Sequence, residues 1–269
     1  MAEENGTAGA TPRPPAMPQV NRIGFADLAE VLRKGLEDFA SAPLFGLFFG
    51  GVYAAGGIII ALSLTVWDIP WMIYPVAIGF PLIGPFVAVG LYDVSRKLEA
   101  GRPLVWREVL TVVLAQRKRE LSWMAFVMLF VLWIWMYQIR LLLALFLGFK
   151  SFLSFDAFVH ILVATPEGLA FLAVGHVVGA FLALALYSIT VVSVPLLLER
   201  NIDFVTAMIT SVSAVFTSPV PMLAWGVVVT LLLIAACIPF FLGLLIVLPV
   251  LGHATWHLYR RIVAPPAAG

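Results

Sequence analysis

The sequence has little of the charge that keeps a soluble protein in water. Charged side chains make up 12% of its 269 residues and apolar ones 62%, whereas a soluble domain carries roughly twice that charge. A chain of this composition cannot bury all of its apolar surface inside itself. Its mean hydropathy of +1.04 therefore predicts lipid surroundings, and its length allows several membrane spans of about 20 residues each.

Cysteine is nearly absent as well. Cys237 is the only one and lies within an apolar run, which excludes an internal disulfide and a multi-cysteine metal site. The chain also lacks a serine-hydrolase elbow, a phosphate-cradling glycine loop, a zinc-protease histidine pair and a haem-attachment motif. The sequence therefore predicts no catalytic residues, no metal site and no enzymatic activity, and a net charge of +1 argues against a nucleic-acid partner.

Long apolar stretches dominate what is present. The six stretches are Pro43 to Val66, Trp71 to Tyr92, Ser122 to Phe149, Glu167 to Leu198, Met222 to Ile238, and Phe240 to Tyr259. In lipid the backbone must satisfy its own hydrogen bonds, and the period-two alternation of a membrane barrel is missing. We therefore predict an all-α, polytopic transmembrane helical bundle of about six spans over residues 21–262. Residues 1–20 are predicted to be a disordered tail without a cleaved signal peptide, and residues 263–269 a C-terminal tail.

Three shorter segments have one apolar face and one polar face. They are Phe25 to Ala40, Leu104 to Ala115 and Asp203 to Thr217, and each is typical of a helix that lies at the membrane surface or caps a bundle. Each precedes a pair of expected spans, and the second span of each pair carries a proline, at Pro85, Pro195 and Pro249. We interpret this order as a threefold repeat of one interfacial helix and two spans.

Basic residues indicate how the chain crosses the membrane. They gather before the first span, between the second and third spans, after the fourth span and at the C-terminus; these residues are Arg13, Arg22, Arg33, Lys34, Arg96, Lys97, Arg102, Arg107, Arg117, Lys118, Arg119, Arg200, Arg260 and Arg261. Positively charged loops stay in the cytoplasm. Both termini are therefore predicted to be cytoplasmic.

Two histidines near the end of the sixth span form one candidate site. His253 and His257 are four residues apart and so lie on one face of a helix, where they could ligate one metal or contribute to a haem or quinone pocket. The alternative is that they sit in an aromatic belt at the membrane interface beside Trp256 and Tyr259, and bond to headgroups or loops.

His176 is a second candidate because the fourth span carries it close to the middle of the bilayer. A titratable group at that depth is costly and often functional; the alternative is a neutral histidine bonded to a neighbouring helix. In the same span, Gly175 and Gly179 form a small-residue ridge, as do Gly46 and Gly50 in the first span. Such ridges favour close helix packing in a compact bundle or a dimer.

The second span is rich in helix-weakening residues, namely Pro75, Gly79, Pro81, Gly84, Pro85 and Gly90. This density is typical of a bent or broken helix, which in transporters exposes backbone groups to a substrate.

Several segments resemble a family of bacterial integral membrane proteins named domain of unknown function 2189. The segments are Ser41-Ala42-Pro43-Leu44, Gly84-Pro85-Phe86-Val87-Ala88-Val89-Gly90-Leu91-Tyr92-Asp93, Thr165-Pro166-Glu167-Gly168-Leu169-Ala170-Phe171, Val194-Pro195-Leu196-Leu197-Leu198, and Gly252 to Arg260. The resemblance implies a multi-pass protein of the bacterial inner membrane. Members are sometimes labelled putative cytochrome c oxidase subunit, but a haem-copper oxidase core has several more histidines in its spans than this chain, which has 4 in total.

Three functional hypotheses follow. The first is a non-catalytic accessory or assembly subunit of a respiratory complex of the cytochrome oxidase type, whose partners are the lipid bilayer and that complex, or a second copy of the chain. The second is a transporter or channel for a small or lipid-like solute. The third is a haem-binding or metal-binding protein that uses His176 with His253 or His257; the first two require no cofactor.

Overall fold

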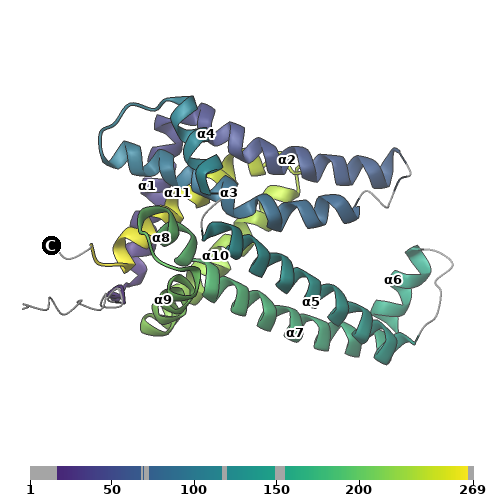
Figure 1. Ribbon diagram of the computed structural model, residues 1–269. Coiled ribbons are helices and arrows are strands. Elements are labelled where there is room, and N and C mark those ends of the chain that lie inside the picture. Colours follow the sequence, from purple (N-terminus) through teal and green to yellow (C-terminus); the bar gives the residue numbers. More distant parts are fainter. Residues whose placement is uncertain (1–16, 68, 70–72, 117–119, 149–154, 266–269) are drawn as a thin grey trace, which may run out of the picture.

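The computed structural model describes residues 17–67, 69, 73–116, 120–148 and 155–265 (Figure 1). The predicted all-α bundle is confirmed for these residues. The helices are α1 (Phe25–Ser41), α2 (Pro43–Thr65), α3 (Ile73–Glu99), α4 (Trp106–Ala115), α5 (Leu121–Leu147), α6 (Phe155–Ala164), α7 (Pro166–Thr190), α8 (Ser193–Glu199), α9 (Phe204–Thr217), α10 (Pro219–Cys237) and α11 (Leu244–Ile262).

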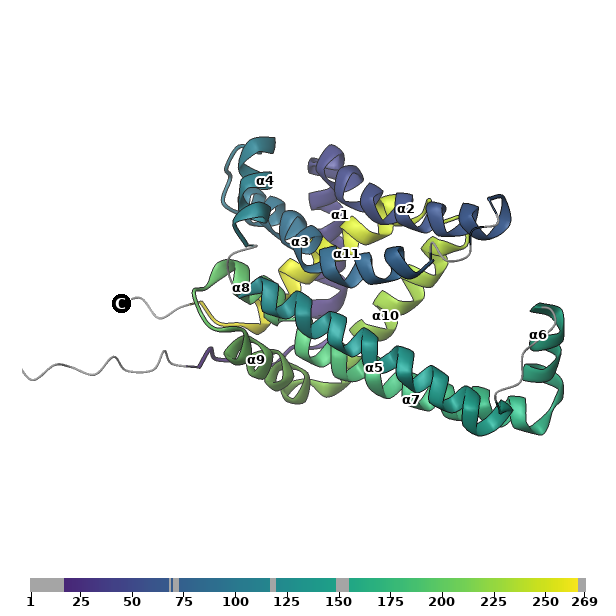
Figure 2. The same ribbon diagram turned by 45° about the vertical axis from the view of Figure 1, so that its right-hand side comes forward.

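The bundle has two different ends. In Figures 1 and 2, α1, α4, α8 and α9 gather with both described chain ends at one side, which we call the terminal end. The other side, which we call the distal end, holds α6, the end of α2 and the start of α3. At the terminal end the two chain ends pair: Val20 and Val263 form an antiparallel bridge, and the amide of Asn21 donates to the carbonyl of Ile262 at 2.7 Å. Residues 1–16 of the expected tail lie outside the described residues.

Four helical segments among the described residues are long and apolar enough to cross a membrane. They are α2, α5, α7 continued through α8, and α10, and they match four of the expected spans. Helix α7 begins with an N-terminal cap. The Thr165 hydroxyl oxygen accepts a hydrogen bond from the amide of Gly168 at 3.0 Å, and proline occupies the first turn.

The other two expected spans are α3 and α11, and both are more polar. Helix α3 runs without interruption past Pro75, Pro81 and Pro85, so of the two forms expected for the second span, a bent helix and a broken one, the broken form is not found. Helix α11 starts at Leu244, after a turn in which Phe240 and Phe241 have positive φ angles of 55° and 65°. Protein encloses most of α11, whose buried residues are Leu244, Pro249, Val250, Leu251, His253, Ala254, Trp256, His257, Leu258, Tyr259 and Ile262. Burial in protein explains how this helix tolerates polar side chains.

The order of the helices follows the expected repeat. The first unit is α1, α2 and α3; the second is α4, α5 and α7 with α8; the third is α9, α10 and α11. Helix α6 is an addition in the second unit. Each unit begins at an aromatic residue, namely Phe25, Trp106 and Phe204.

The three units close into a ring. Each interfacial helix packs on the last helical element of the unit before it: α4 on α3, α9 on α7 and α8, and α1 on α11. The last of these contacts joins the first helix of the chain to the final one. Helices α3, α8 and α11 also contact one another, so they form the centre around which the units are arranged.

Glycines allow the closest helix approaches in this ring. A Cβ atom added to Gly35 of α1 would lie 2.6 Å from the carbonyl oxygen of Val250 and 2.7 Å from the amide nitrogen of Ala254, both on α11. The Gly46 ridge of α2 is used in the same way, since a Cβ there would be 2.6 Å from the ring of Phe39. A Cβ at Gly179 would meet Trp135 of α5 at 2.8 Å. Gly46 and Gly179 each belong to a predicted ridge, and at these two positions the ridges make close contacts.

Replacing Gly35 by alanine tests the contact between α1 and α11. The added methyl group must displace backbone, which we expect to cost about 1–3 kcal/mol of the free energy of unfolding. The matched variant Gly51→Ala has its nearest neighbour at 3.8 Å and should gain up to about 1 kcal/mol from helix propensity. Thermal unfolding of the detergent-solubilised variants measures both, and equal midpoints would mean that α1 is not held against α11.

Candidate functional site

A cluster of polar residues joins the three units at the terminal end. Arg260 near the end of α11 pairs with Glu99, the last residue of α3, at 3.2 Å, and with Glu199, the last residue of α8, at 2.9 Å. The Tyr259 hydroxyl donates to Glu199, and the Trp256 indole Nε1 donates to Glu99 at 3.3 Å. One cation thus holds a carboxylate from each of the other two central helices. We call these five residues the central cluster.

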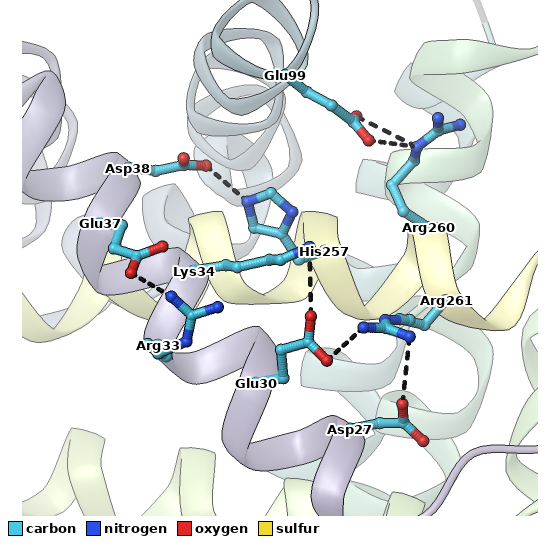
Figure 3. Close-up of polar contacts among 10 residues, drawn as sticks. All are labelled: Asp27, Glu30, Arg33, Lys34, Glu37, Asp38, Glu99, His257, Arg260 and Arg261. Atoms are coloured by element: carbon cyan, nitrogen blue, oxygen red, sulfur yellow. Dashed lines mark hydrogen bonds and ion pairs between the residues drawn. The ribbon is translucent and has the colours of Figure 1, made fainter.

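A second set of charges holds α1 on α11 (Figure 3). Arg261 pairs with Asp27 at 3.6 Å and also with Glu30. The Nε2 atom of His257 lies 2.8 Å from a carboxylate oxygen of Asp38. The Arg261 guanidinium, mainly through its hydrogen bond, lowers the pKa of the Glu30 carboxyl below its ordinary value. The interfacial helix α1 is therefore docked by charge as well as by close packing.

His253 of α11 is bonded to helix α3. Its side chain is fully buried, and its Nδ1 atom lies 2.8 Å from the hydroxyl oxygen of Ser95 on α3. Its Nε2 atom has no hydrogen-bond partner in the part of the chain that the structure describes. His253 and His257 therefore each link α11 to a different neighbour. Trp256 and Tyr259 are buried too, so this segment is not an aromatic belt at a membrane surface.

Buried charge also connects α3 to α4. The Asp93 carboxylate is fully buried beside Arg96 and 3.7 Å from the Lys97 ammonium, and Lys97 reaches Glu108 of α4 at 2.6 Å. Hydrogen bonding to Lys97 lowers the pKa of the Glu108 carboxyl. These residues were not predicted as a site; the nearest signal was the amphipathic pattern of the α4 segment.

His176 lies elsewhere, on α7. It lines a groove of about 550 Å³ whose residues all come from α5 and α7, so the groove includes neither His253 nor His257. The imidazole Nδ1 is 2.6 Å from the carbonyl oxygen of Leu172, one turn earlier in the same helix. We call this the α5–α7 groove. Within the described residues, no three His, Cys, Asp or Glu side chains form a group that could hold a metal ion.

Aromatic side chains form a second surface feature, along α5. Trp123, Phe126, Phe130, Trp133 and Tyr137, which we call the aromatic stripe, are each between 48% and 58% exposed. Four of them line a groove of about 650 Å³ that also includes Ile78 of α3. The alternating spacing of three and four residues in the sequence could have identified this stripe.

Removing Arg260 tests the central cluster. Arg260→Met leaves Glu99 and Glu199 without their shared cation, and we expect the thermal midpoint to fall by about 5 °C. The matched variant Arg33→Met breaks an exposed pair with Glu37 within one helix, which is worth roughly 0–1 kcal/mol. Equal midpoints for the two variants would contradict a structural role for the cluster.

Comparison with known proteins agrees with the membrane architecture. A family model described as predicted integral membrane protein, domain of unknown function 2189, matches residues 73–199, which extend from the start of α3 to the end of α8. No curated protein and no solved structure matches the chain. The chain is an integral membrane protein with several apolar helices, and its residues 73–199 are similar to the domain of unknown function 2189 family.

Proposed function

We propose that the chain is a non-catalytic membrane component that packs against a transmembrane helix of a larger complex through the aromatic stripe of α5. The observation that carries this proposal is the stripe itself. Its members follow one another at intervals of three, four, three and four residues, which is the spacing by which one helix packs along another.

The position of the stripe supports a protein partner over lipid alone. From Trp123 to Tyr137 it extends about 21 Å along the helix axis, a large part of a hydrocarbon core about 30 Å thick. Tryptophan and tyrosine normally concentrate at the two membrane interfaces. A continuous row through the interior offers large, rigid contact surfaces of the kind that dominate binding energy at protein interfaces.

The stripe is pre-ordered by contacts among its own rings. Trp133 and Tyr137 meet edge to face with centroids 5.2 Å apart, and Trp123 and Phe126 do so at 6.4 Å. Trp123 also stacks on Phe204 of α9 at 5.9 Å. Rings held in this way lose little conformational entropy when a partner binds.

The complex that we propose as partner is a respiratory one of the cytochrome oxidase type in a bacterial inner membrane, with both termini of this chain in the cytoplasm. The proposal of a respiratory partner rests on the family resemblance given above. An accessory or assembly role fits the chain better than a catalytic one, because His253 and His257 each bond to a different neighbouring helix, through Ser95 and Asp38.

Affinity purification from native membranes tests this function. The double variant Phe130→Leu, Trp133→Leu should recover at least tenfold less of the partner complex than the unaltered chain, because two central aromatic anchors are lost. The matched variant Phe181→Leu removes an aromatic residue of α7 that is 70% exposed and lies outside the stripe, and it should recover the complex fully.

The extracts are prepared in a mild detergent and quantified by mass spectrometry. Recovery of the unaltered chain only as a monomer or homodimer would sink the proposal of a partner complex. Equal recovery by both variants would remove the stripe as its binding surface.

A further inference from the structure

The α5–α7 groove brings two polar side chains together at one depth. Gln138 lies nine residues before the end of α5, and His176 lies ten residues after the start of α7. At 1.5 Å per residue both are about 14–15 Å from the distal ends of their helices, and so near the middle of a hydrocarbon core about 30 Å thick. A polar group at that depth is costly unless it has a hydrogen-bond partner.

The contact of His176 with its own helix fixes the role of each ring nitrogen. The Leu172 carbonyl oxygen can only accept a hydrogen bond, so the His176 Nδ1 atom 2.6 Å away must be the donor. In a neutral imidazole the Nε2 atom then carries a lone pair and accepts. The groove therefore offers the Nε2 atom of His176 as a hydrogen-bond acceptor, because the contact with Leu172 uses only Nδ1.

Gln138 adds a second unused group. Its amide has two donor hydrogens and a carbonyl acceptor, and the described part of the chain gives this side chain no hydrogen bond. Both residues line the same groove. An occupant that donates to His176 and accepts from Gln138 would satisfy both.

The rest of the groove limits the occupant further. The lining residues are Trp135, Gln138, Ile139, Leu142, Phe171, Leu172, Gly175, His176, Val178, Gly179, Ala180, Leu182 and Ala183. None is Asp, Glu, Lys or Arg, which favours a neutral ligand. At Gly175 an added Cβ would be 4.0 Å from its nearest neighbour, a methyl carbon of Leu142, so the missing side chain leaves free space beside His176. The volume of about 550 Å³ is that of a small-molecule site, which is typically apolar with few polar groups.

We propose that the α5–α7 groove binds a neutral, membrane-soluble ring compound that carries hydroxyl groups, of the quinol class. One hydroxyl group of the ligand donates a hydrogen bond to His176 Nε2, and the oxygen of its other hydroxyl group accepts one from the Gln138 amide. The ring packs beside Gly175 and the indole of Trp135, and its apolar tail extends into lipid through the open side of the groove. A lipid acyl chain fits the apolar walls but satisfies neither polar group.

Saturation binding of a radiolabelled decyl benzoquinol to the purified full chain in detergent tests this site. We expect saturable binding at one site per chain, weakened about tenfold or more by His176→Leu and by Gln138→Leu, since each removes one hydrogen bond. His176→Gln keeps an acceptor and should restore part of the affinity. Gly175→Leu fills the groove and should abolish binding.

Two controls make the result specific. The dimethyl ether of the same ring lacks a donor and should bind the unaltered chain as weakly as the quinol binds His176→Leu. Val177→Leu alters a neighbouring side chain that is 71% exposed and is absent from the groove lining, and it should leave affinity unchanged. Equal binding of quinol and ether, equal affinity of all variants, or binding that does not saturate would each overturn the proposal.

This inference does not rest on the proposed partner complex. The assay uses purified protein without a partner, and Trp135, Ile139 and Leu142 do not belong to the aromatic stripe. Loss of partner recovery with intact quinol binding would count against the proposed function alone. Intact partner recovery without quinol binding would count against the groove alone.

Discussion

The packing of α1 on α11 is the contact on which the arrangement of the other helices depends. It joins the first helix of the chain to the final one, and α2 and α3 of the first unit also contact α11. These contacts close the three units into a ring with α3, α8 and α11 at its centre. The contact combines the close approach at Gly35 with charge pairs from Arg261 and His257. At Gly35 the two backbones meet with no side chain between them, and the charge pairs join particular residues of the two helices. Together these contacts fix the register of α1 on α11.

Many of the polar side chains of the chain are used in the contacts between helices that close the ring. Arg260, Glu99 and Glu199 hold the central helices together, and Ser95 and Asp38 bond to the two histidines of α11. In a protein surrounded by lipid such groups are stable only when they pair with one another. The features left for binding therefore lie on the outer helices α5 and α7, where the aromatic stripe and the α5–α7 groove face outward.

Local patterns predicted the helices well because each span and each amphipathic segment is encoded within its own residues. The enclosure of α11 could not be predicted in this way, since it depends on which helices surround it. Arg260 and Glu99 are 161 positions apart, and no local pattern indicates such a pair. The one available signal was that Leu98-Glu99 and Leu198-Glu199 end equivalent helices of the repeat.

The candidate residues illustrate the same limit. The spacing of His253 and His257 correctly predicted a shared helix, but spacing could not predict that Ser95 and Asp38 would bind them separately. His176 was identified as unusual from its depth alone. Its neighbour Gln138 lies on another helix, and its free Nε2 atom follows from a contact with Leu172 that only the side-chain geometry reveals.

Ring closure is tested most directly by linking the two chain ends covalently. Residues paired across an antiparallel bridge have Cα atoms about 4.5–5.5 Å apart, which lies within the range that a disulfide spans. With Cys237 replaced by serine, the double variant Val20→Cys, Val263→Cys in isolated membranes should form a disulfide within one chain when a copper–phenanthroline oxidant is added to take up the two electrons; mass spectrometry of the cross-linked peptides detects it. Absence of the link, or links only between separate chains, would contradict a ring closed by α1 on α11.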